Sequence, residues 1–232
     1  MIFVQLGAGA GDLDPRANYR DGFSEFVKRY NTKKKQIFLV EANPRNIKTL
    51  KKCWKNYKNV KIFNHALVPD NINSNTLDFF YSEDDGPYYQ TFSLKIEHIK
   101  KHYPSSKIKK IKIKTQKINN FFDINFKNIV IDYLGIDLEG IDFEILNSIN
   151  FDNFNVQNIS FEYLHLTKNE KKKIIKKLNS YGYSYYGYGL DHNNYDYLFT
   201  KKKLLLNRLI SKIIPYISNK YIKFLNTFIK SN

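Results

Sequence analysis

The sequence holds a single cysteine, Cys53, among its 232 residues. One thiol cannot form an internal disulfide, and it leaves no thiolate cluster for a structural zinc ion. A reducing, cytoplasmic compartment fits this composition. No apolar run reaches the roughly 18 residues that a membrane-spanning helix needs, which excludes an ordinary span. An apolar run follows Met1 directly, so we expect no secretory signal peptide.

Acidic residues are the minority charge, with 22 Asp and Glu against 38 Lys and Arg and a net charge of +16. Such an excess suits nucleic acid or an anionic membrane surface as a partner. Lys, Asn, Ile, Tyr and Phe are abundant together, however, as AT-rich coding sequence produces without selection for binding. The charge alone therefore establishes no partner. The length suits one α/β domain with a sizeable core.

An apolar run over residues 3–6 ends in three glycines at alternate positions, Gly7, Gly9 and Gly11. This pattern predicts a buried strand that turns sharply beneath a ligand. A side chain at these positions would forbid the turn or hold the backbone away from a bound cofactor. A helix that starts soon afterwards would direct its free N–H groups at an anion over the turn. A glycine-rich turn without a ligand is the alternative.

A second apolar run, residues 36–40, ends at Glu41. An acidic residue at the carboxyl end of the second strand is where a Rossmann-type sheet places its acceptor for ribose hydroxyls. The glycine spacing is G-x-G-x-G rather than G-x-G-x-x-G, and Glu41 lies further along than the roughly 20 residues usual for a dinucleotide site. The pattern favours S-adenosylmethionine over NAD.

Strand and helix signals alternate along the rest of the chain, which predicts a mostly parallel sheet. We expect the last two strands to form an antiparallel hairpin, whereas the last strands of the plain dinucleotide fold are all parallel. The predicted strands cover residues 3–6, 36–40, 60–63, 75–82, 108–118, 129–136, 158–165, 183–187 and 195–201, and the helices cover 22–30, the segment after Pro44, and 167–180.

Two segments between the strands carry unusual side chains. Residues 83–93 mix acids, aromatics and hydroxyls, and we assign this loop to acceptor recognition. Lys110, Lys112 and Lys114 alternate with Ile111 and Ile113, as on a half-exposed strand. Lysines there guard against edge-to-edge pairing, with phosphate binding as the less favoured alternative.

Five motifs together give the chain a family resemblance. They are residues 6–12 (LGAGAGD), 40–44 (VEANP), 64–67 (NHAL), 136–146 (IDLEGIDFEIL) and 161–165 (FEYLH). Over residues 2–201 the sequence resembles the FkbM-type family of class I S-adenosylmethionine-dependent methyltransferases. The resemblance implies a Rossmann-like sheet, that cofactor, and O-methylation of sugars, glycans or small metabolites. Family members often carry structure ahead of the first strand, so we expect an acceptor cleft that is open or completed by a partner.

The resemblance also implies roles for particular residues. Asp137, Glu139 and His165 are the candidates for a base that takes a proton from an alcohol acceptor. Asp137 and Glu162 could instead hold a divalent metal ion, which we rank below a metal-free route. The helix dipole explains Asp142 and Glu144. The expected cofactor contacts are Gly7, Ala8, Gly9, Gly11, Asp12, Glu41, Asn43, His65, Ala66 and Asp137.

Residues 202–232 form a tail in which apolar residues recur at helical spacing opposite exclusively basic ones. We expect a domain over residues 1–201 followed by this amphipathic tail. The tail either packs on the domain or a second subunit, or lies on an anionic membrane surface beside the cytoplasm. Two other functions stay open, namely RNA-directed methylation and an inactive fold that binds partners.

Overall fold

A computed structural model describes residues 1–13, 21–29, 35–86, 91–190 and 195–201 of the chain. The tail over residues 202–232 lies outside these ranges, so its predicted helices and its membrane or packing role stay predictions. The tip of the loop assigned to acceptor recognition, residues 87–90, also lies outside them.

The described residues form a main sheet with seven strands in the order β11-β12-β10-β8-β1-β2-β3. Neighbouring strands from β10 to β3 are parallel, whereas β12 is antiparallel to both β10 and β11. The predicted α/β fold with a closing hairpin is therefore confirmed. The strands are β1 (Ile2–Leu6), β2 (Gln36–Val40), β3 (Val60–Phe63), β8 (Tyr133–Ile136), β10 (Asn158–Glu162), β11 (Ser184–Tyr188) and β12 (Asp196–Thr200).

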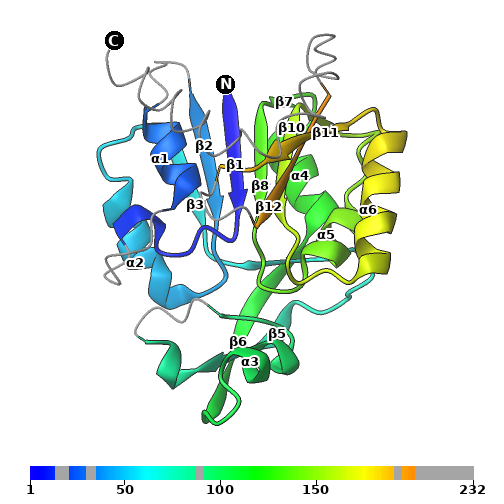
Figure 1. Cartoon of the computed structure of the whole chain (residues 1–232). Coiled ribbons are helices and arrows are strands. Elements are labelled where there is room, and N and C mark those ends of the chain that lie inside the picture. Colours follow the sequence, from blue (N-terminus) through cyan, green and yellow to red (C-terminus); the bar gives the residue numbers. More distant parts are fainter. Residues whose placement is uncertain (14–20, 30–34, 87–90, 191–194, 202–232) are drawn as a thin grey trace.

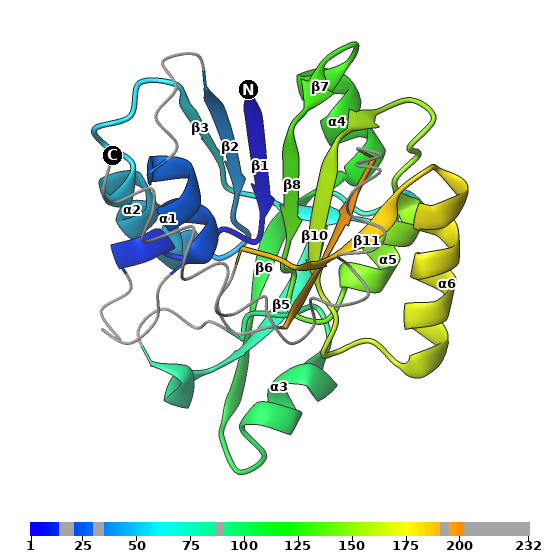
Figure 2. The same ribbon diagram turned by 45° about the horizontal axis from the view of Figure 1, so that its top comes forward.

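Helices cover both faces of this sheet because its strands are apolar on both sides. Val4 and Leu6 share a core with residues of α4, α5 and α6, whereas Phe3 packs with residues of α1 and α2. Figures 1 and 2 show α1 and α2 on one side of the sheet and α4, α5 and α6 on the other. The helices are α1 (Gly22–Arg29), α2 (Pro44–Cys53), α4 (Ile118–Phe126), α5 (Asp142–Ser148) and α6 (Lys168–Ser180).

Local sequence signals explain where two of these helices begin. Asn43 is the N-cap of α2, where its side chain accepts the N–H of Arg45, and Pro44 follows as the first helical residue. Thr167 and Glu170 form a capping box at the start of α6, a pattern that residues three apart in the sequence specify. Within the described part of the chain, every helix is too short or too polar to cross a bilayer.

Asp132 splits the strand predicted over residues 129–136. Its carboxylate accepts the N–H of Ile2 at 2.8 Å, which anchors the chain at the start of β1. The residues before it form β7 (Val130–Ile131), which pairs with β9 (Asn155–Val156) in a separate small sheet. The residues after it form β8, between β1 and β10 in the main sheet.

Residues 66–117 form an insert between β3 and α4, below the carboxyl ends of the parallel strands in Figure 1. It contains a sheet in the order β4-β6-β5, made of β4 (Ala66–Val68), β5 (Thr76–Ser82) and β6 (Ile108–Lys117). The helix α3 (Ile96–His102) packs beside β5 and β6. Two lysines of β6 pair with acids of the neighbouring segment: Lys110 with Asp78 of β5 at 2.6 Å, and Lys109 with Glu83, which follows β5.

Candidate functional site

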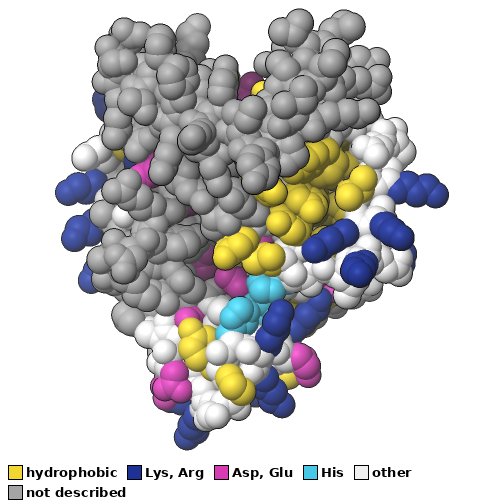
Figure 3. Space-filling model, in the orientation of Figure 1, with side chains coloured by type: hydrophobic (Ala, Val, Ile, Leu, Met, Phe, Trp, Pro, Cys, Tyr) yellow, Lys and Arg dark blue, Asp and Glu magenta, His cyan; other side chains and the backbone are white. Residues whose placement is uncertain are grey.

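A cleft of about 440 Å³ separates the carboxyl ends of the main strands from the insert. Its volume falls in the range of small-molecule and cofactor sites. The glycine turn after β1, the ends of β2, β8 and β10, and residues of the insert all contribute to its lining. Figure 3 shows histidine side chains at the surface next to acidic side chains. This edge of the sheet is where ligands bind in open α/β folds.

The glycine turn approaches its neighbours too closely to admit a side chain at its first position. A Cβ on Gly7 would lie 1.6 Å from the carbonyl oxygen of Asp137, and the φ of Gly7 is +83°. The N–H groups of Gly7 and Ala8 both donate to the carbonyl of Val40, at 2.9 and 3.0 Å. The turn is thereby fixed between β2 and β8.

Glu41 holds the glycine turn and the start of α2 together. It is 6% exposed. Its Oε2 accepts the N–H of Gly9 at 2.7 Å, and its Oε1 accepts the N–H of Asn43 at 2.7 Å and the side-chain amide of Asn46 at 3.3 Å. Burial raises the pKa of Glu41, and these hydrogen bonds oppose that rise. Since each carboxylate oxygen can accept two hydrogen bonds, Oε2 keeps capacity for one more.

Eight of the ten predicted cofactor contacts line the cleft together. The other two lie elsewhere. Asp12 forms an ion pair with Lys28 at 2.7 Å and accepts a hydrogen bond from the thiol of Cys53. Asn43 is buried as the N-cap of α2. Both side chains are thus engaged in holding the segments around the turn.

Asp137 and His65 both line the cleft, and each has one buried polar atom that is not hydrogen-bonded within the described residues. Oδ1 of Asp137 and Nε2 of His65 are buried and have no hydrogen-bond partner among the described residues. Burial raises the pKa of Asp137 well above its ordinary value, and the charges of Glu139 and Glu162 raise it further. Burial lowers the pKa of His65. Buried polar atoms without partners are rare unless a ligand or water satisfies them.

The loop that carries Asp137 and Glu139 is braced by Asp142. The carboxylate of Asp142 accepts the N–H groups of Leu138 and Gly140, at 2.8 and 3.2 Å. The sequence suggested only that Asp142 stabilises the dipole of α5. The structure shows that it also holds the loop in place. Burial, followed by the charge of Asp142, raises the pKa of Glu139 to about 8.

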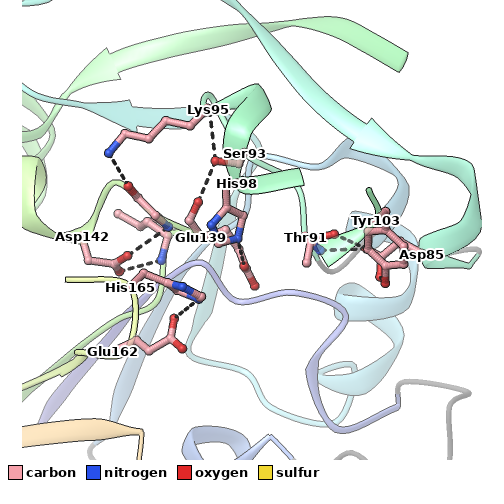
Figure 4. A network of polar contacts seen from close by, with 12 residues as sticks. Asp85, Thr91, Ser93, Lys95, His98, Tyr103, Glu139, Asp142, Glu162 and His165 are labelled. Atoms are coloured by element: carbon pink, nitrogen blue, oxygen red, sulfur yellow. Dashed lines mark hydrogen bonds and ion pairs between the residues drawn. The ribbon is translucent and has the colours of Figure 1, made fainter. Parts of the chain in front are cut away.

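The insert is pinned to this same loop by polar contacts (Figure 4). The hydroxyl of Ser93 donates to the carbonyl of Glu139 at 2.6 Å, and Lys95 donates to the carbonyl of Gly140 at 2.6 Å. His98 of α3 contacts Glu139, with 3.0 Å between Nε2 and Oε2. These contacts close one side of the cleft.

Three histidines meet at the mouth of the cleft. His98 and His102 come from α3, and His165 comes from the turn after β10, where it contacts Glu162 at 3.3 Å. Burial lowers the pKa of His165 to about 4, and the neighbouring imidazoles and Lys101 add to that shift. Sequence analysis identified His165 but missed His98 and His102. Their spacing of four residues on one helix was the available signal.

The described lining of the cleft is acidic in composition, whereas the whole chain is basic. None of its described lining residues is Lys or Arg, whereas the full sequence has a net charge of +16. Carboxylates that share a desolvated site repel one another, and a cationic ligand would relieve that repulsion. The acidic lining residues are Asp21, Glu41, Asp85, Asp137, Glu139 and Glu162.

Comparison with protein families matches residues 5–185 to the model described as the methyltransferase FkbM domain. A comparison with curated proteins finds no match. Three solved structures have distantly similar folds. The Methanococcus jannaschii fibrillarin pre-rRNA processing protein gives a TM-score of 0.41 at 12% identity, covering 86% of this chain and 65% of that one. Precorrin-6y C5,15-methyltransferase from Geobacter metallireducens GS-15 gives a TM-score of 0.42 at 14% identity, covering 86% of this chain and 78% of that one.

The third structure is Aeropyrum pernix fibrillarin, solved with natively bound S-adenosyl-L-methionine, which gives a TM-score of 0.40 at 13% identity and covers 86% of this chain and 64% of that one. The chain thus spans less than two thirds of the length of both fibrillarins. Similarity at this level carries no argument about acceptor or partners.

Proposed function

The chain belongs to the methyltransferase FkbM domain family, whose cofactor is S-adenosylmethionine, and we propose that it methylates a hydroxyl of a sugar, glycan or small polyhydroxylated metabolite. One observation carries the choice of acceptor. The cleft combines groups able to take a proton with an acidic lining in which no described residue is Lys or Arg. Such a lining suits an uncharged acceptor better than a phosphorylated one.

The residues of the cleft fit the cofactor. Glu41 keeps hydrogen-bonding capacity on Oε2 for a ribose hydroxyl, and Gly9 presents open space in which a Cβ would meet no atom within 4 Å. The acidic lining suits a cationic sulfonium and amino group. By family resemblance, His65 and Ala66 lie against the adenine. The buried Nε2 of His65 offers a ring nitrogen one unused hydrogen-bonding position.

The bound cofactor supplies a methyl group that its sulfonium already activates, so the chain has to align the acceptor and exclude water. Asp137 and His165 are the groups we propose to take the acceptor proton. One of them would take the proton of the hydroxyl as its oxygen accepts the methyl group, and the group that leaves would be a neutral thioether. Glu139, the third candidate, is engaged with His98 and is therefore better placed to position that ring.

RNA-directed methylation is the second candidate, because the full chain carries a net charge of +16. Phosphates close to the cleft would meet the carboxylates of Asp85, Glu139 and Glu162, which disfavours this candidate. Basic residues elsewhere on the chain could still contact an RNA backbone.

One experiment tests these alternatives together. The purified full chain is incubated with labelled S-adenosylmethionine and a panel of neutral sugars, glycans, lipids and RNA. We expect label on a hydroxyl of an uncharged polyhydroxylated acceptor. Label confined to RNA would overturn the proposal in favour of the second candidate. Cofactor affinity is measured separately by calorimetry, and its absence would favour an inactive fold.

A further inference from the structure

We infer that His98, His102 and His165 bind a divalent transition-metal ion of the zinc class at the mouth of the cleft, and that this ion binds the acceptor hydroxyl. The role toward the acceptor rests on the proposed function. The metal site itself does not, because it is defined by the side chains alone.

The geometry of the three imidazoles is close to that of a metal site. One potential ligand nitrogen from each ring lies within 4.8 Å of the other two. Zinc–nitrogen bonds of about 2.0–2.1 Å in a tetrahedral arrangement separate two ligand nitrogens by about 3.4 Å. Modest rotations of the side chains would close this gap. The four-residue spacing of His98 and His102 places both rings on one face of α3, opposite His165.

A purely structural role explains only part of this cluster. The contacts of His98 with Glu139 and of His165 with Glu162 could by themselves join the insert to the sheet. His102 makes no hydrogen bond or ion pair with any described residue, yet its ring centroid lies 4.8 Å from that of His98 and 5.7 Å from that of His165. No contact within the described residues requires this third imidazole beside the pair, whereas a shared ligand would.

The charges around the cluster favour a cation. Glu139 and Glu162 contact two of the rings, and carboxylates paired with ligand histidines orient the rings and raise metal affinity. Burial lowers the pKa of all three imidazoles, and Lys101 lowers it further, which favours their neutral form. The neutral imidazole is the form that binds a metal ion, and imidazole nitrogen suits zinc and its neighbours.

The position of the cluster gives the ion a role. His102 and His165 line the same cleft as Asp137. Three protein ligands leave a coordination position open, as in catalytic zinc sites, and a hydroxyl bound there becomes more acidic. A His165 that binds the ion would not also take the acceptor proton, so that proton would pass to the carboxylate of Asp137, and the hydroxyl oxygen would form a C–O bond with the methyl group, as proposed above. The step requires no further reactant.

The test uses the full chain, treated with a chelator, dialysed, and titrated with Zn²⁺ alone by calorimetry. We expect one Zn²⁺ per chain, and Co²⁺ should give the visible absorption of a tetrahedral imidazole site. His102→Ala should weaken Zn²⁺ binding by about a hundredfold or more, since loss of an outer-shell partner already costs about 10–100-fold. His102 is exposed at the last position of α3, so this variant should fold. Lys100→Ala, an exposed neighbour on the same helix, is the matched control.

Absence of Zn²⁺ binding, or equal affinity in His102→Ala and Lys100→Ala, would overturn the metal site. His165→Asn tests the ligand from the other segment and should also weaken Zn²⁺ binding. Thermal melting checks that this variant is folded. Cofactor binding is measured on the same preparations. Cofactor binding without Zn²⁺ binding refutes the site and leaves the proposed function intact. Zn²⁺ binding in a chain that methylates no acceptor supports the site and overturns the proposed function. Full methyl transfer by the chelated chain would overturn the role toward the acceptor.

Discussion

Two glycines of the same turn should respond to alanine to different degrees. Gly7 and Gly9 both have positive φ, at +83° and +52°, so Ala costs about 1–2 kcal/mol of backbone strain at either position. Their surroundings differ. A Cβ on Gly7 would overlap the carbonyl oxygen of Asp137, whereas a Cβ on Gly9 meets no atom within 4 Å. Only the first substitution forces β1 and β8 apart.

The magnitude follows from this overlap. Overpacking a rigid interior costs about 1–3 kcal/mol, so Gly7→Ala should lose about 2–5 kcal/mol once the backbone strain is added. That is a large share of the roughly 5–15 kcal/mol that stabilises a typical domain. Gly9→Ala should lose only the strain. Its methyl group enters the cleft beside Glu41, so we expect this variant to fold but to bind S-adenosylmethionine weakly.

Urea unfolding gives the two free energies, and calorimetry gives the cofactor affinity. Gly9→Ala serves as the matched control for strain, because both residues lie in one turn. Free energies of unfolding within about 0.5 kcal/mol of each other would refute the argument from the Asp137 carbonyl. Undiminished cofactor affinity in a folded Gly9→Ala would refute the placement of the cofactor over this turn.

Four further predictions test other parts of the site. Glu41→Gln should weaken cofactor binding by about 1.5–3 kcal/mol through the loss of charge-assisted hydrogen bonds, and unchanged affinity by calorimetry would contradict this. Asp137→Asn and His165→Ala should each lower turnover roughly a hundredfold with unchanged circular dichroism, whereas near-parental turnover in both would count against them as bases. Burial, reinforced by a hydrogen bond to a carboxylate, raises the pKa of Cys53 from 9.0 to about 11. The Cys53 thiol of the folded chain should thus be alkylated slowly below that pH and faster as the thiolate forms. A midpoint near pH 9 for the alkylation rate of the folded chain would show that the thiol is not shielded. The tail should carry the full chain onto anionic vesicles in a salt-sensitive way, and equal, salt-insensitive partitioning of a chain ending at Lys201 would leave only the packing role.

The parts of the fold that can be predicted from the sequence are those that patterns of neighbouring residues determine. The apolar runs before Gly7 and Glu41 specify adjacent buried strands, and the structure pairs them in parallel. Thr167 and Glu170 indicate the start of α6, because a capping box depends only on two residues three positions apart. Such signals do not depend on the rest of the chain.

The missed parts depend on contacts between distant segments. His98 and His102 reach the cleft because Ser93 and Lys95 fix the insert to the loop at Glu139, a contact that no local pattern encodes. The sequence likewise places Asp12 after the glycine turn as a cofactor contact, but its carboxylate is paired with a lysine sixteen positions away. A family motif gives the position of a side chain along the backbone and leaves its partner unspecified.

The acidic lining of the cleft also bears on turnover. On the proposed placement of the cofactor, the carboxylates of the cleft would face a cation before transfer and a neutral thioether afterwards. The cleft would then hold the fresh cofactor more tightly than the product by the lost electrostatic attraction, which favours exchange after each cycle. No Lys or Arg among the described lining residues offsets this preference. Release of the product would thereby depend on the same carboxylates that favour binding of the cofactor.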